Sequence, residues 1–452
     1  MYDIIVIGGG PGGYLAAERA GQAGLKTLLV EKTRLGGVCL NEGCIPSKVL
    51  LNSAKLYDYT KGETAGYGVT SQNAAINHGM VIQRKNTVVD ALCRGVEMQM
   101  KKSGAETVNT EALITGKCAK GFQVKADDKT YVGKNLIIAS GANAIIPPID
   151  GAEAGVADGF CMTSREALEI RTLPKELAII GGGAIGLEFA SYFNSIGVKV
   201  TVIEALGKIG GVIDEEIAKQ LQRVYEKRGV KIWLDSKVTQ ITKNSVVFQK
   251  NREEMQISCD KVLLSVGRRA NVQVGLDSIG VSYTPKGIET DSRMRTNVSN
   301  VYAIGDCTGK SMLAHCAYRA AEVAVNNIIG KNDTIENCSV PSVIYTHPEV
   351  ASAGITEEEA KVSGKNYRVI RLPAAYSGRA MAESNDGIGM CKLIVDKDTD
   401  TFLGMHLFSP YASEIIVSCV MMIDERIPID RIKKFIFPHP TVGELIREAL
   451  FY

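Results

Sequence analysis

The chain has 452 residues, enough for about two to four domains. Its 52 Lys and Arg nearly balance its 50 Asp and Glu, so charge gives no argument for nucleic acid or an anionic membrane as the main partner. No apolar run is long enough to span a bilayer, and a strand that begins at Tyr2 leaves no room for a signal peptide, so we expect a cytoplasmic protein. The 11 cysteines are mostly single, which is typical neither of a secreted disulfide framework nor of a zinc site, and we expect no metal.

The N-terminus has the pattern of a dinucleotide-binding unit. A strand from Asp3 leads into Gly8-x-Gly10-x-x-Gly13 and then a helix through Ala23. A second strand, residues 27–30, ends at Glu31. The glycines allow a tight turn and close approach of the backbone to a pyrophosphate, and the acid can accept hydrogen bonds from ribose hydroxyls.

Two cysteines follow this unit, five residues apart, at Cys39 and Cys44. They stand after a Gly pair and before Pro46-Ser47-Lys48. The spacing is wrong for a C-x-x-C site, but it allows a disulfide that clips a short loop against the start of a helix. In a reducing compartment a disulfide here is more typical of catalysis than of structure. The alternatives are two buried free thiols or a structural loop staple.

The next segments complete the first domain. Residues 50–58 and 75–103 have helical composition, and residues 108–132 are broken into short strands typical of a small antiparallel layer. Residues 136–141 are predicted to form a buried parallel strand that returns to the first sheet. Pro147-Pro148 mark a crossing to a new domain.

A second dinucleotide unit then repeats the first. A strand at 177–180 leads into Gly181-x-Gly183-x-x-Gly186 and a helix, and the next strand ends at Glu204. A carboxylate at that position suits a free 2′-hydroxyl and repels a 2′-phosphate, and no arginine follows it, so NAD is favoured over NADP.

The predicted order of strands and helices changes in the C-terminal third of the chain. Residues 301–306 form another strand ending on an acid, with a helix at 313–329. From about Cys338 the chain has strands without intervening helices, then helices at 412–424 and after Thr441. We therefore predict an α/β protein with two Rossmann-like dinucleotide-binding domains and a C-terminal α+β dimerisation domain. The predicted boundaries are 1–145 for the first part of one nucleotide domain, 146–268 for the other, 269–336 for a central part that completes the first, and 337–452 for the interface domain.

These motifs together resemble the flavin-dependent pyridine nucleotide-disulfide oxidoreductases. The resemblance covers the whole chain in the family's domain order, and within the family it is greatest to the dihydrolipoamide dehydrogenase branch. The residues that carry it are Gly8-Gly-Gly-Pro-Gly-Gly13, Gly37-Val-Cys-Leu-Asn-Glu-Gly-Cys-Ile-Pro-Ser-Lys48, Gly181-Gly-Gly-Ala-Ile-Gly-Leu-Glu188, Ala303-Ile-Gly-Asp306, Met312-Leu-Ala-His315, Tyr345-Thr-His-Pro-Glu-Val350 and His439-Pro-Thr-Val-Gly-Glu444.

The resemblance implies FAD and NAD as cofactors. The residues implied to hold FAD are Gly8, Gly10, Gly13, Glu31, Lys48, Gly116, Ser140, Gly141, Asp306 and Ala314. Those implied to line the NAD site are Gly181, Gly183, Gly186, Glu204, Val238 and Gly267. The implied catalytic residues are Cys39, Cys44, His439, Glu444, Lys48 and Glu188.

The implied roles are unequal. Cys44 would lie against the flavin and Cys39 would exchange with substrate, while His439 from the partner subunit acts as base and Glu444 orients it. Lys48 would pair with Glu188 near the flavin. From the residues alone, His439 is equally well a core or cap histidine. A lysine such as Lys48 is more often a solvated helix residue, and a glutamate such as Glu188 is more often a charge on a helix face. Residues that depart from the family pattern are Ser140, Ala144, Ala270 and Phe437.

The implied activity is oxidation of protein-bound dihydrolipoamide through a Cys39–Cys44 disulfide and FAD, with hydride transfer to NAD. The implied partners are a second copy of the chain and a lipoyl-bearing carrier or acyltransferase of a 2-oxoacid dehydrogenase or glycine cleavage complex. The alternative is an NADPH-dependent disulfide reductase of the glutathione or mercuric reductase type. Glu204 argues against NADPH, and the end of the sequence at Phe451-Tyr452 lacks the paired cysteines expected of a mercuric reductase.

Overall fold

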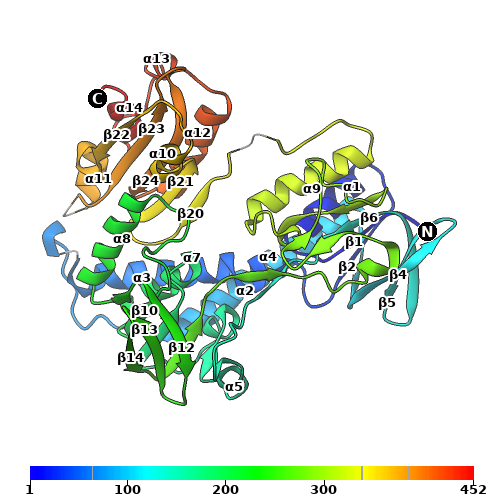
Figure 1. The fold of residues 1–452 in the computed structure, drawn as a ribbon, viewed down its shortest axis with the longest axis horizontal. Coiled ribbons are helices and arrows are strands. Elements are labelled where there is room, and N and C mark those ends of the chain that lie inside the picture. The colour runs from blue at the N-terminus through cyan, green and yellow to red at the C-terminus, as the bar shows by residue number, and fades with distance from the viewer. Residues whose placement is uncertain (64, 337–338, 385–386) are drawn as a thin grey trace. The chain divides into compact units, whose positions relative to one another are not determined.

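The structure is a computed structural model that describes residues 1–63, 65–336, 339–384 and 387–452 (Figure 1). The chain forms two compact units, each built from several stretches of sequence. The first contains Met1–Val49, Gly79–Ile145 and Gly267–Glu336, and the second contains Leu50–His78, Ile146–Val266 and Asn337–Tyr452. The predicted start of the interface domain, residue 337, lies outside the described residues. None of the described helices combines the length and apolar character needed to cross a membrane.

The first unit is built on a seven-stranded sheet. Its strands run in the order β3-β2-β1-β6-β5-β4, and β19 also pairs with β6. β1, β2, β3 and β19 are parallel to their neighbours, as expected of a dinucleotide-binding sheet, whereas β4, β5 and the start of β6 form an antiparallel layer. The elements of this unit are β1 (Tyr2–Ile7), α1 (Pro11–Gln22), β2 (Thr27–Glu31), α2 (Gly37–Glu42), β3 (Glu106–Asn109), β4 (Ala112–Cys118), β5 (Gly121–Ala126), β6 (Lys129–Ile138), β7 (Ala142–Ala144), β16 (Arg268–Ala270), η3 (Leu276–Ile279), β17 (Tyr283–Thr284), β18 (Gly287–Ile288), β19 (Val301–Ala303), η4 (Gly305–Thr308) and α9 (Ala314–Ile328).

Two helices each begin in one unit and end in the other: α3 (Cys44–Asp58) and α4 (His78–Ser103). The sequence predicts short strands up to residue 132 and a separate strand from 136. The structure instead has one continuous strand, β6, whose first half pairs with β5 and whose second half pairs with β1. Pairing on both sides therefore holds the chain extended through the expected break.

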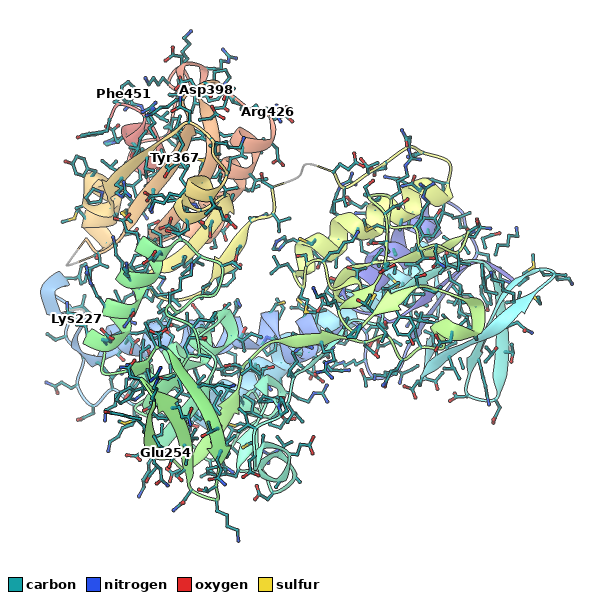
Figure 2. All side chains as sticks on the ribbon, in the orientation of Figure 1. Lys227, Glu254, Tyr367, Asp398, Arg426 and Phe451 are labelled. Atoms are coloured by element: carbon teal, nitrogen blue, oxygen red, sulfur yellow. The ribbon has the colours of Figure 1, made fainter. Side chains whose placement is uncertain are left out.

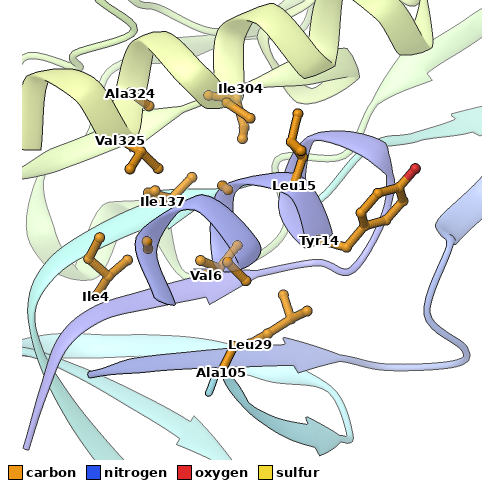
Figure 3. Close-up of a cluster of buried hydrophobic side chains, with 14 of the residues drawn as sticks. Ile4, Val6, Tyr14, Leu15, Leu29, Ala105, Ile137, Ile304, Ala324 and Val325 are labelled. Atoms are coloured by element: carbon orange, nitrogen blue, oxygen red, sulfur yellow. The ribbon is translucent and has the colours of Figure 1, made fainter. Parts of the chain in front are cut away.

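The helices of the first unit pack on its sheet through a large apolar core. This core, which we call the α1–α9 core, contains Ile4, Val6, Tyr14, Leu15, Leu29, Ile137, Ile304, Ala324 and Val325 among its members (Figure 3). Small residues on α1, such as Ala16 and Ala17, are fully buried and let α1 and α9 approach closely. A second core on the other face of the sheet includes Ile5, Leu28 and Val301.

The second unit contains another parallel sheet, of order β11-β10-β9-β15-β8, and a three-stranded antiparallel layer, β12-β13-β14. Lys227 at the end of α8 and Glu254 on β14 are exposed charged side chains of this unit (Figure 2). The elements are η1 (Tyr59–Glu63), η2 (Ala65–Tyr67), α5 (Ala152–Ala157), β8 (Cys161–Met162), α6 (Ser164–Ala167), β9 (Glu176–Ile180), α7 (Ala184–Ser195), β10 (Lys199–Ile203), α8 (Glu215–Lys227), β11 (Lys231–Trp233), β12 (Ser236–Ile241), β13 (Ser245–Lys250), β14 (Glu253–Ser258) and β15 (Lys261–Leu264).

The C-terminal part of this unit is the predicted α+β layer. A five-stranded antiparallel sheet of order β20-β21-β24-β23-β22 is packed against α12 and α14. Its elements are β20 (Ser342–Ile344), β21 (Glu349–Gly354), α10 (Glu357–Val362), β22 (Tyr367–Pro373), η5 (Ala374–Tyr376), α11 (Gly378–Glu383), β23 (Met390–Asp396), β24 (Thr401–Ser409), α12 (Ala412–Asp424), α13 (Ile429–Ile432) and α14 (Glu444–Ala449).

Candidate active site and nucleotide sites

The first glycine loop has the backbone geometry of a pyrophosphate cradle. Gly8 has φ +101°, and a Cβ there would lie 2.2 Å from the Ala139 carbonyl oxygen. A Cβ on Gly13 would lie 1.8 Å from the Gly8 carbonyl oxygen, so only glycine fits either position. Around Gly10 the nearest atom to such a Cβ is 3.8 Å away, which leaves the N-terminus of α1 open toward a ligand.

Glu31 closes this loop from the end of β2. Its Oε2 accepts a hydrogen bond from the Gly9 N–H at 2.6 Å, and its Oε1 accepts from the Thr33 N–H and hydroxyl at 2.8 and 2.9 Å. Each carboxylate oxygen has two lone-pair sites, so capacity remains for a ribose hydroxyl. Beside it is a cavity of about 400 Å³, lined by Glu31, Thr33, Arg34, Leu35, Glu97, Lys101, Thr107, Val108 and Asn109. The loop and this cavity fit the ADP half of FAD.

The remaining residues predicted for FAD lie on other elements of the same unit. Ser140 donates through its hydroxyl to the Asn271 carbonyl at 2.6 Å, and the Gly141 carbonyl accepts from the Asn271 N–H at 2.9 Å. Burial raises the pKa of Asp306, which follows β19, although the charge of Arg268 opposes this rise. Ala314 is the first residue of α9, and Gly116 has φ +152° at a bulge of β4.

The second glycine loop repeats this geometry. Gly181 has φ +103°, and a Cβ on Gly186 would lie 2.1 Å from the Gly181 carbonyl oxygen, while no atom lies within 4 Å of one on Gly183. Glu204 accepts from the Gly182 N–H at 2.6 Å and from the Leu206 N–H at 2.8 Å. The residues fit NAD, whose free 2′-hydroxyl a carboxylate can bind.

Val238 and Gly267 are the two other residues predicted for the NAD site. Val238 is a buried member of the apolar core that also contains Ile241 and Phe248, and its role in NAD binding stays a prediction. Gly267 has φ +120° and its carbonyl accepts from the Ile145 N–H at 3.1 Å; it belongs to the first unit.

The two cysteines are not joined by the short loop that the sequence predicts. Cys39 lies within α2, and Cys44 is the first residue of α3, because Gly43 separates the two helices with φ −149° and ψ −108°. Both are free thiols in this structure, so the disulfide remains a prediction. The side-chain hydrogen bond with Cys44 and burial raise the pKa of Cys39, whereas the charge of Lys48 lowers it. The thiols and Lys48 therefore act on one another within the first unit.

Asn41, between the two cysteines, was not predicted as a site residue. Its amide donates to the Leu35 and Gly37 carbonyls at 3.2 and 2.9 Å, and its oxygen accepts from the Cys93 thiol at 3.3 Å. It thus fixes the turn that carries Cys39. The one feature of the sequence that could have pointed to this role is the position of Asn41 between the two cysteines. Six of the nine other cysteines are buried, as expected of small core residues, whereas Cys316 is half-buried, Cys118 is exposed and Cys338 lies outside the described residues.

His439 and Glu444 form the predicted pair. His439 Nδ1 is 2.9 Å from Glu444 Oε1, and the imidazole side chain is 79% exposed, whereas Glu444 is 15% exposed. The Thr441 N–H donates to Glu444 Oε2 at 2.7 Å, and this bond, followed by the bond to His439, holds the pKa of Glu444 below its ordinary value. An ionised carboxylate on Nδ1 selects the tautomer whose Nε2 is free to take a proton.

Lys48 and Glu188 lie in different units, and their pairing remains a prediction. Lys48 Nζ is 3.4 Å from the Ser47 hydroxyl. Glu188, on α7, is 8% exposed and accepts from the Tyr345 N–H at 3.2 Å.

Comparison with known proteins shows the family to which the chain belongs. Residues 2–321 match the family model described as pyridine nucleotide-disulphide oxidoreductase, and residues 340–450 match the dimerisation domain of the same family. The chain is 35% identical to the dihydrolipoyl dehydrogenase of Mycoplasma pneumoniae, over 100% of this chain and 99% of that protein. It is 38% identical to the mitochondrial dihydrolipoyl dehydrogenase of Homo sapiens, over 99% of this chain and 89% of that protein.

Among solved structures, the HOCl-induced flavoprotein disulfide reductase RclA from Escherichia coli superposes with a TM-score of 0.88 at 27% identity, covering 100% of this chain and 99% of that one. The matched dimerisation domain supports a homodimer. Oxidoreductases of the dihydrolipoyl dehydrogenase type use FAD and NAD, which the two glycine loops fit. The chain belongs to the pyridine nucleotide-disulphide oxidoreductase family.

Proposed function

We propose that the chain oxidises dihydrolipoamide on a lipoyl-bearing carrier protein and passes the electrons to NAD. The observation that carries this proposal is the combination, in one chain, of a Cys39–Cys44 pair, a His439–Glu444 pair and a carboxylate at Glu204. The full-length relatives named dihydrolipoyl dehydrogenase support it. The carrier would belong to a 2-oxoacid dehydrogenase or glycine cleavage complex.

The proposed reaction begins with a proton transfer. A dithiol near neutral pH is mostly protonated and needs a base, and imidazole has the pKa suited to that task. Nε2 of His439 of the partner subunit takes the proton of one substrate thiol, while Glu444 holds Nδ1–H and stabilises the imidazolium.

The thiolate then attacks the oxidised cysteine pair. Its sulfur bonds to Cys39, the Cys39–Cys44 bond breaks, and Cys44 leaves as a thiolate with the electron pair. The second substrate thiol loses its proton and attacks the mixed disulfide, which closes the substrate ring and releases Cys39 as a thiol. Lys48 supplies positive charge beside the thiols. When bound, FAD supplies the step that converts the dithiol electrons into a hydride for NAD.

The redox role is tested with Cys44→Ser and Cys39→Ser variants. Each should retain flavin and lose at least about 1,000-fold in NAD reduction by dihydrolipoamide, because the exchange requires both sulfurs. Activity within about tenfold of the parent protein would contradict the mechanism.

The sharing of one site between two subunits has a separate test. His439→Gln and Cys39→Ser subunits are unfolded, mixed in equal amounts and reassembled. If each site takes its base from the other chain, heterodimers keep one intact site, and random assembly should restore about one quarter of parental activity. Activity that stays absent in every mixture would show that both groups come from one chain.

A second candidate is an NADPH-dependent reductase of disulfide substrates. The fold similarity to a flavoprotein disulfide reductase favours this class. It predicts faster turnover with NADPH and a disulfide such as oxidised glutathione than with NAD and dihydrolipoamide. Glu204 opposes it, since a carboxylate repels a 2′-phosphate. Initial rates with each nucleotide and substrate at equal concentrations decide between the two.

A further inference from the structure

A pair of tyrosines joins the two helices of the first nucleotide unit. Tyr14, on α1, directly follows Gly13, and Tyr318 lies on α9, 304 residues later. Their hydroxyl oxygens are 2.5 Å apart, and their rings meet edge to face with centroids 6.1 Å apart. This hydrogen bond therefore links the helix that begins at the pyrophosphate cradle to the helix that begins at Ala314.

The tyrosines share a core with the helices that carry the cysteines. Tyr14 and Leu40 are buried members of the α1–α9 core, and Tyr318 and Ile45 pack against it. Leu40 follows Cys39 and Ile45 follows Cys44, so each redox cysteine is anchored by its next neighbour in this core. Figure 3 shows Tyr14 extending from α1 on the same helix as Leu15.

The turn before Cys39 also rests directly on the start of α1. The Gly36 N–H donates to the Gly9 carbonyl at 2.8 Å. A Cβ on Gly37 would lie 2.5 Å from the Gly10 Cα, which shows that the two backbones touch. A shift of α1 relative to α9 would therefore reach the cysteine helix through backbone contact as well as through Leu40.

The tyrosine hydroxyls stay neutral and respond to charge on the cysteines. Burial, then the hydrogen bond to Tyr318, then negative charge on Cys39 and Cys44 raise the pKa of Tyr14. Burial and the same two cysteines raise the pKa of Tyr318, against the effect of its bond with Tyr14. In a hydroxyl pair one O–H donates to the other oxygen, and the second O–H remains to turn toward a nearby anion. The other ionisable group that acts on Cys39 is Lys48.

We propose that Tyr14 and Tyr318 are positioning residues for the Cys39–Cys44 pair, which lock α1 to α9 and direct a hydroxyl dipole that stabilises the reduced cysteines. This stabilisation affects the reduction of the Cys39–Cys44 disulfide. In that step the disulfide takes two electrons from the reducing thiol and becomes a thiol–thiolate pair or, with protons from solvent, a dithiol. Since the hydroxyls favour the charged reduced form, their removal makes the disulfide harder to reduce. This inference rests on the proposed redox role of the two cysteines.

The experiment compares Tyr14→Phe and Tyr318→Phe with a matched control, Tyr2→Phe. Tyr2 is equally buried in the same unit, and its hydroxyl also makes a hydrogen bond, to Glu106 Oε2 at 2.6 Å. Its ring packs against Tyr131 and belongs to the second core of this unit, whereas Tyr14 and Leu40 belong to the α1–α9 core. Flavin-loaded proteins are equilibrated in glutathione redox buffers, and their free thiols are trapped with a maleimide and counted by mass spectrometry.

We expect each of the two test variants to shift the dithiol–disulfide equilibrium toward the disulfide by about threefold to tenfold, where tenfold corresponds to about 30 mV for two electrons. Tyr2→Phe should leave the equilibrium unchanged. The thiolate absorbance of the reduced test variants should also titrate at higher pH, which mere loss of packing would not produce, because phenylalanine keeps the ring.

Several results would overturn the inference. An equilibrium within about twofold of the parent in flavin-loaded Tyr14→Phe and Tyr318→Phe, or a shift toward the dithiol, would show that the pair only fills the core. If Tyr14→Phe loses flavin, the half-buried Tyr318→Phe decides alone. Cys44→Ser cannot form the disulfide, so its thiol count shows what the redox buffers do in the absence of the cysteine pair. If the thiol count of the parent protein changes no more than that of Cys44→Ser, the parent has no redox disulfide, and the proposed function fails together with the inference.

Discussion

The first and second glycine loops of this molecule have similar backbone angles and similar close contacts, yet only the first leads to a pair of cysteines. Gly8 and Gly181 have φ of +101° and +103°, and the two helices are capped by Gly10 and Gly183 with φ of −71° and −75°. Four strands of each sheet repeat the same order, β3-β2-β1-β6 and β11-β10-β9-β15. The fifth strands differ in connectivity, since β19 follows β6 in the chain and β8 precedes β9.

The two units diverge after the acidic residue of the second strand. In the first unit, the Gly36 N–H donates a hydrogen bond to the Gly9 carbonyl at 2.8 Å, and the chain continues into α2, which contains Cys39. In the second, the Gly210 N–H closes on the Gly182 carbonyl at 2.7 Å, and the chain leads to Asp214, which caps α8. The glycine loop thus builds a nucleotide site in both units, and the segment after it determines whether thiol chemistry is placed beside that site.

The largest expected effects come from the third glycine of each loop. Gly13→Ala should yield protein without flavin, and Gly186→Ala should retain flavin but lose roughly 100-fold or more in affinity for NADH, because the new Cβ would overlap a carbonyl oxygen of its own loop. Flavin absorbance of the purified proteins and anaerobic titration with NADH measure the two losses. If Gly186→Ala removed the flavin instead, the assignment of the loops would be reversed.

A matched control lies in the same loop. Gly183→Ala has room for its Cβ and an ordinary φ, so the protein itself tolerates it. It should weaken NADH binding only through closer contact with the ligand, with the unfolding temperature unchanged. A loss of thermal stability equal to that of Gly186→Ala would contradict the steric argument.

Much of this comparison could be predicted from sequence because its determinants are local. Glycine spacing, a short apolar strand and a closing acid lie within about 25 residues, which is why both loops could be predicted from the pattern as dinucleotide sites. The helix of Ala412–Asp424 and the strand at Met390 are likewise specified by nearby residues.

Features that depend on distant residues could not be predicted. The Gly36-Gly37 pair suggests a loop, yet packing on α1 folds the next six residues into α2. β6 is continuous because β1, β5 and β19 pair along it. The Tyr14–Tyr318 bond joins positions 304 residues apart, and neither residue belongs to a motif.

Substitution of Glu31 and Glu204 tests whether the two glycine loops bind their nucleotides in the same way. Glu31→Gln and Glu204→Gln each place an amide N–H₂ where one oxygen now accepts a backbone N–H. Losing a charge-assisted hydrogen bond costs roughly 1.5–3 kcal/mol, so FAD and NAD affinity should fall about 10- to 100-fold, each in its own variant. Ultrafiltration measures FAD release and isothermal calorimetry measures NAD binding. Unchanged NAD affinity in Glu204→Gln would show that the carboxylate is not used.

Asp306 marks a difference between the units. In the second sheet the place beside the fourth strand is taken by β8, which comes earlier in the chain and is followed by neutral Thr163, the N-cap of α6. Burial raises the pKa of Asp306, so its ionisation opposes folding. The penalty is absent below the ordinary aspartate pKa of about 4 and grows as pH rises through the raised value. Asp306→Asn should therefore stabilise the flavin-free protein above this window and leave it unchanged below. The unfolding temperature of both proteins is measured as a function of pH. A difference between them that stays constant from below about pH 4 to above the raised pKa would contradict this.

The smallest effect concerns one hydroxyl that the second unit lacks. The Thr33 hydroxyl donates to Glu31 at 2.9 Å, whereas Leu206 occupies the corresponding place two residues after Glu204. Thr33→Val removes this bond and keeps the backbone N–H that both units share. Because Thr33 is exposed, the cost should be about 0.5–1 kcal/mol, or up to about fivefold in FAD affinity. Thr60→Val, at an exposed hydroxyl that donates to the Tyr57 carbonyl in the second unit, is the control. A loss as large as that of Glu31→Gln would mean that Thr33, rather than the backbone, orients the carboxylate, and the two loops would then bind by different means.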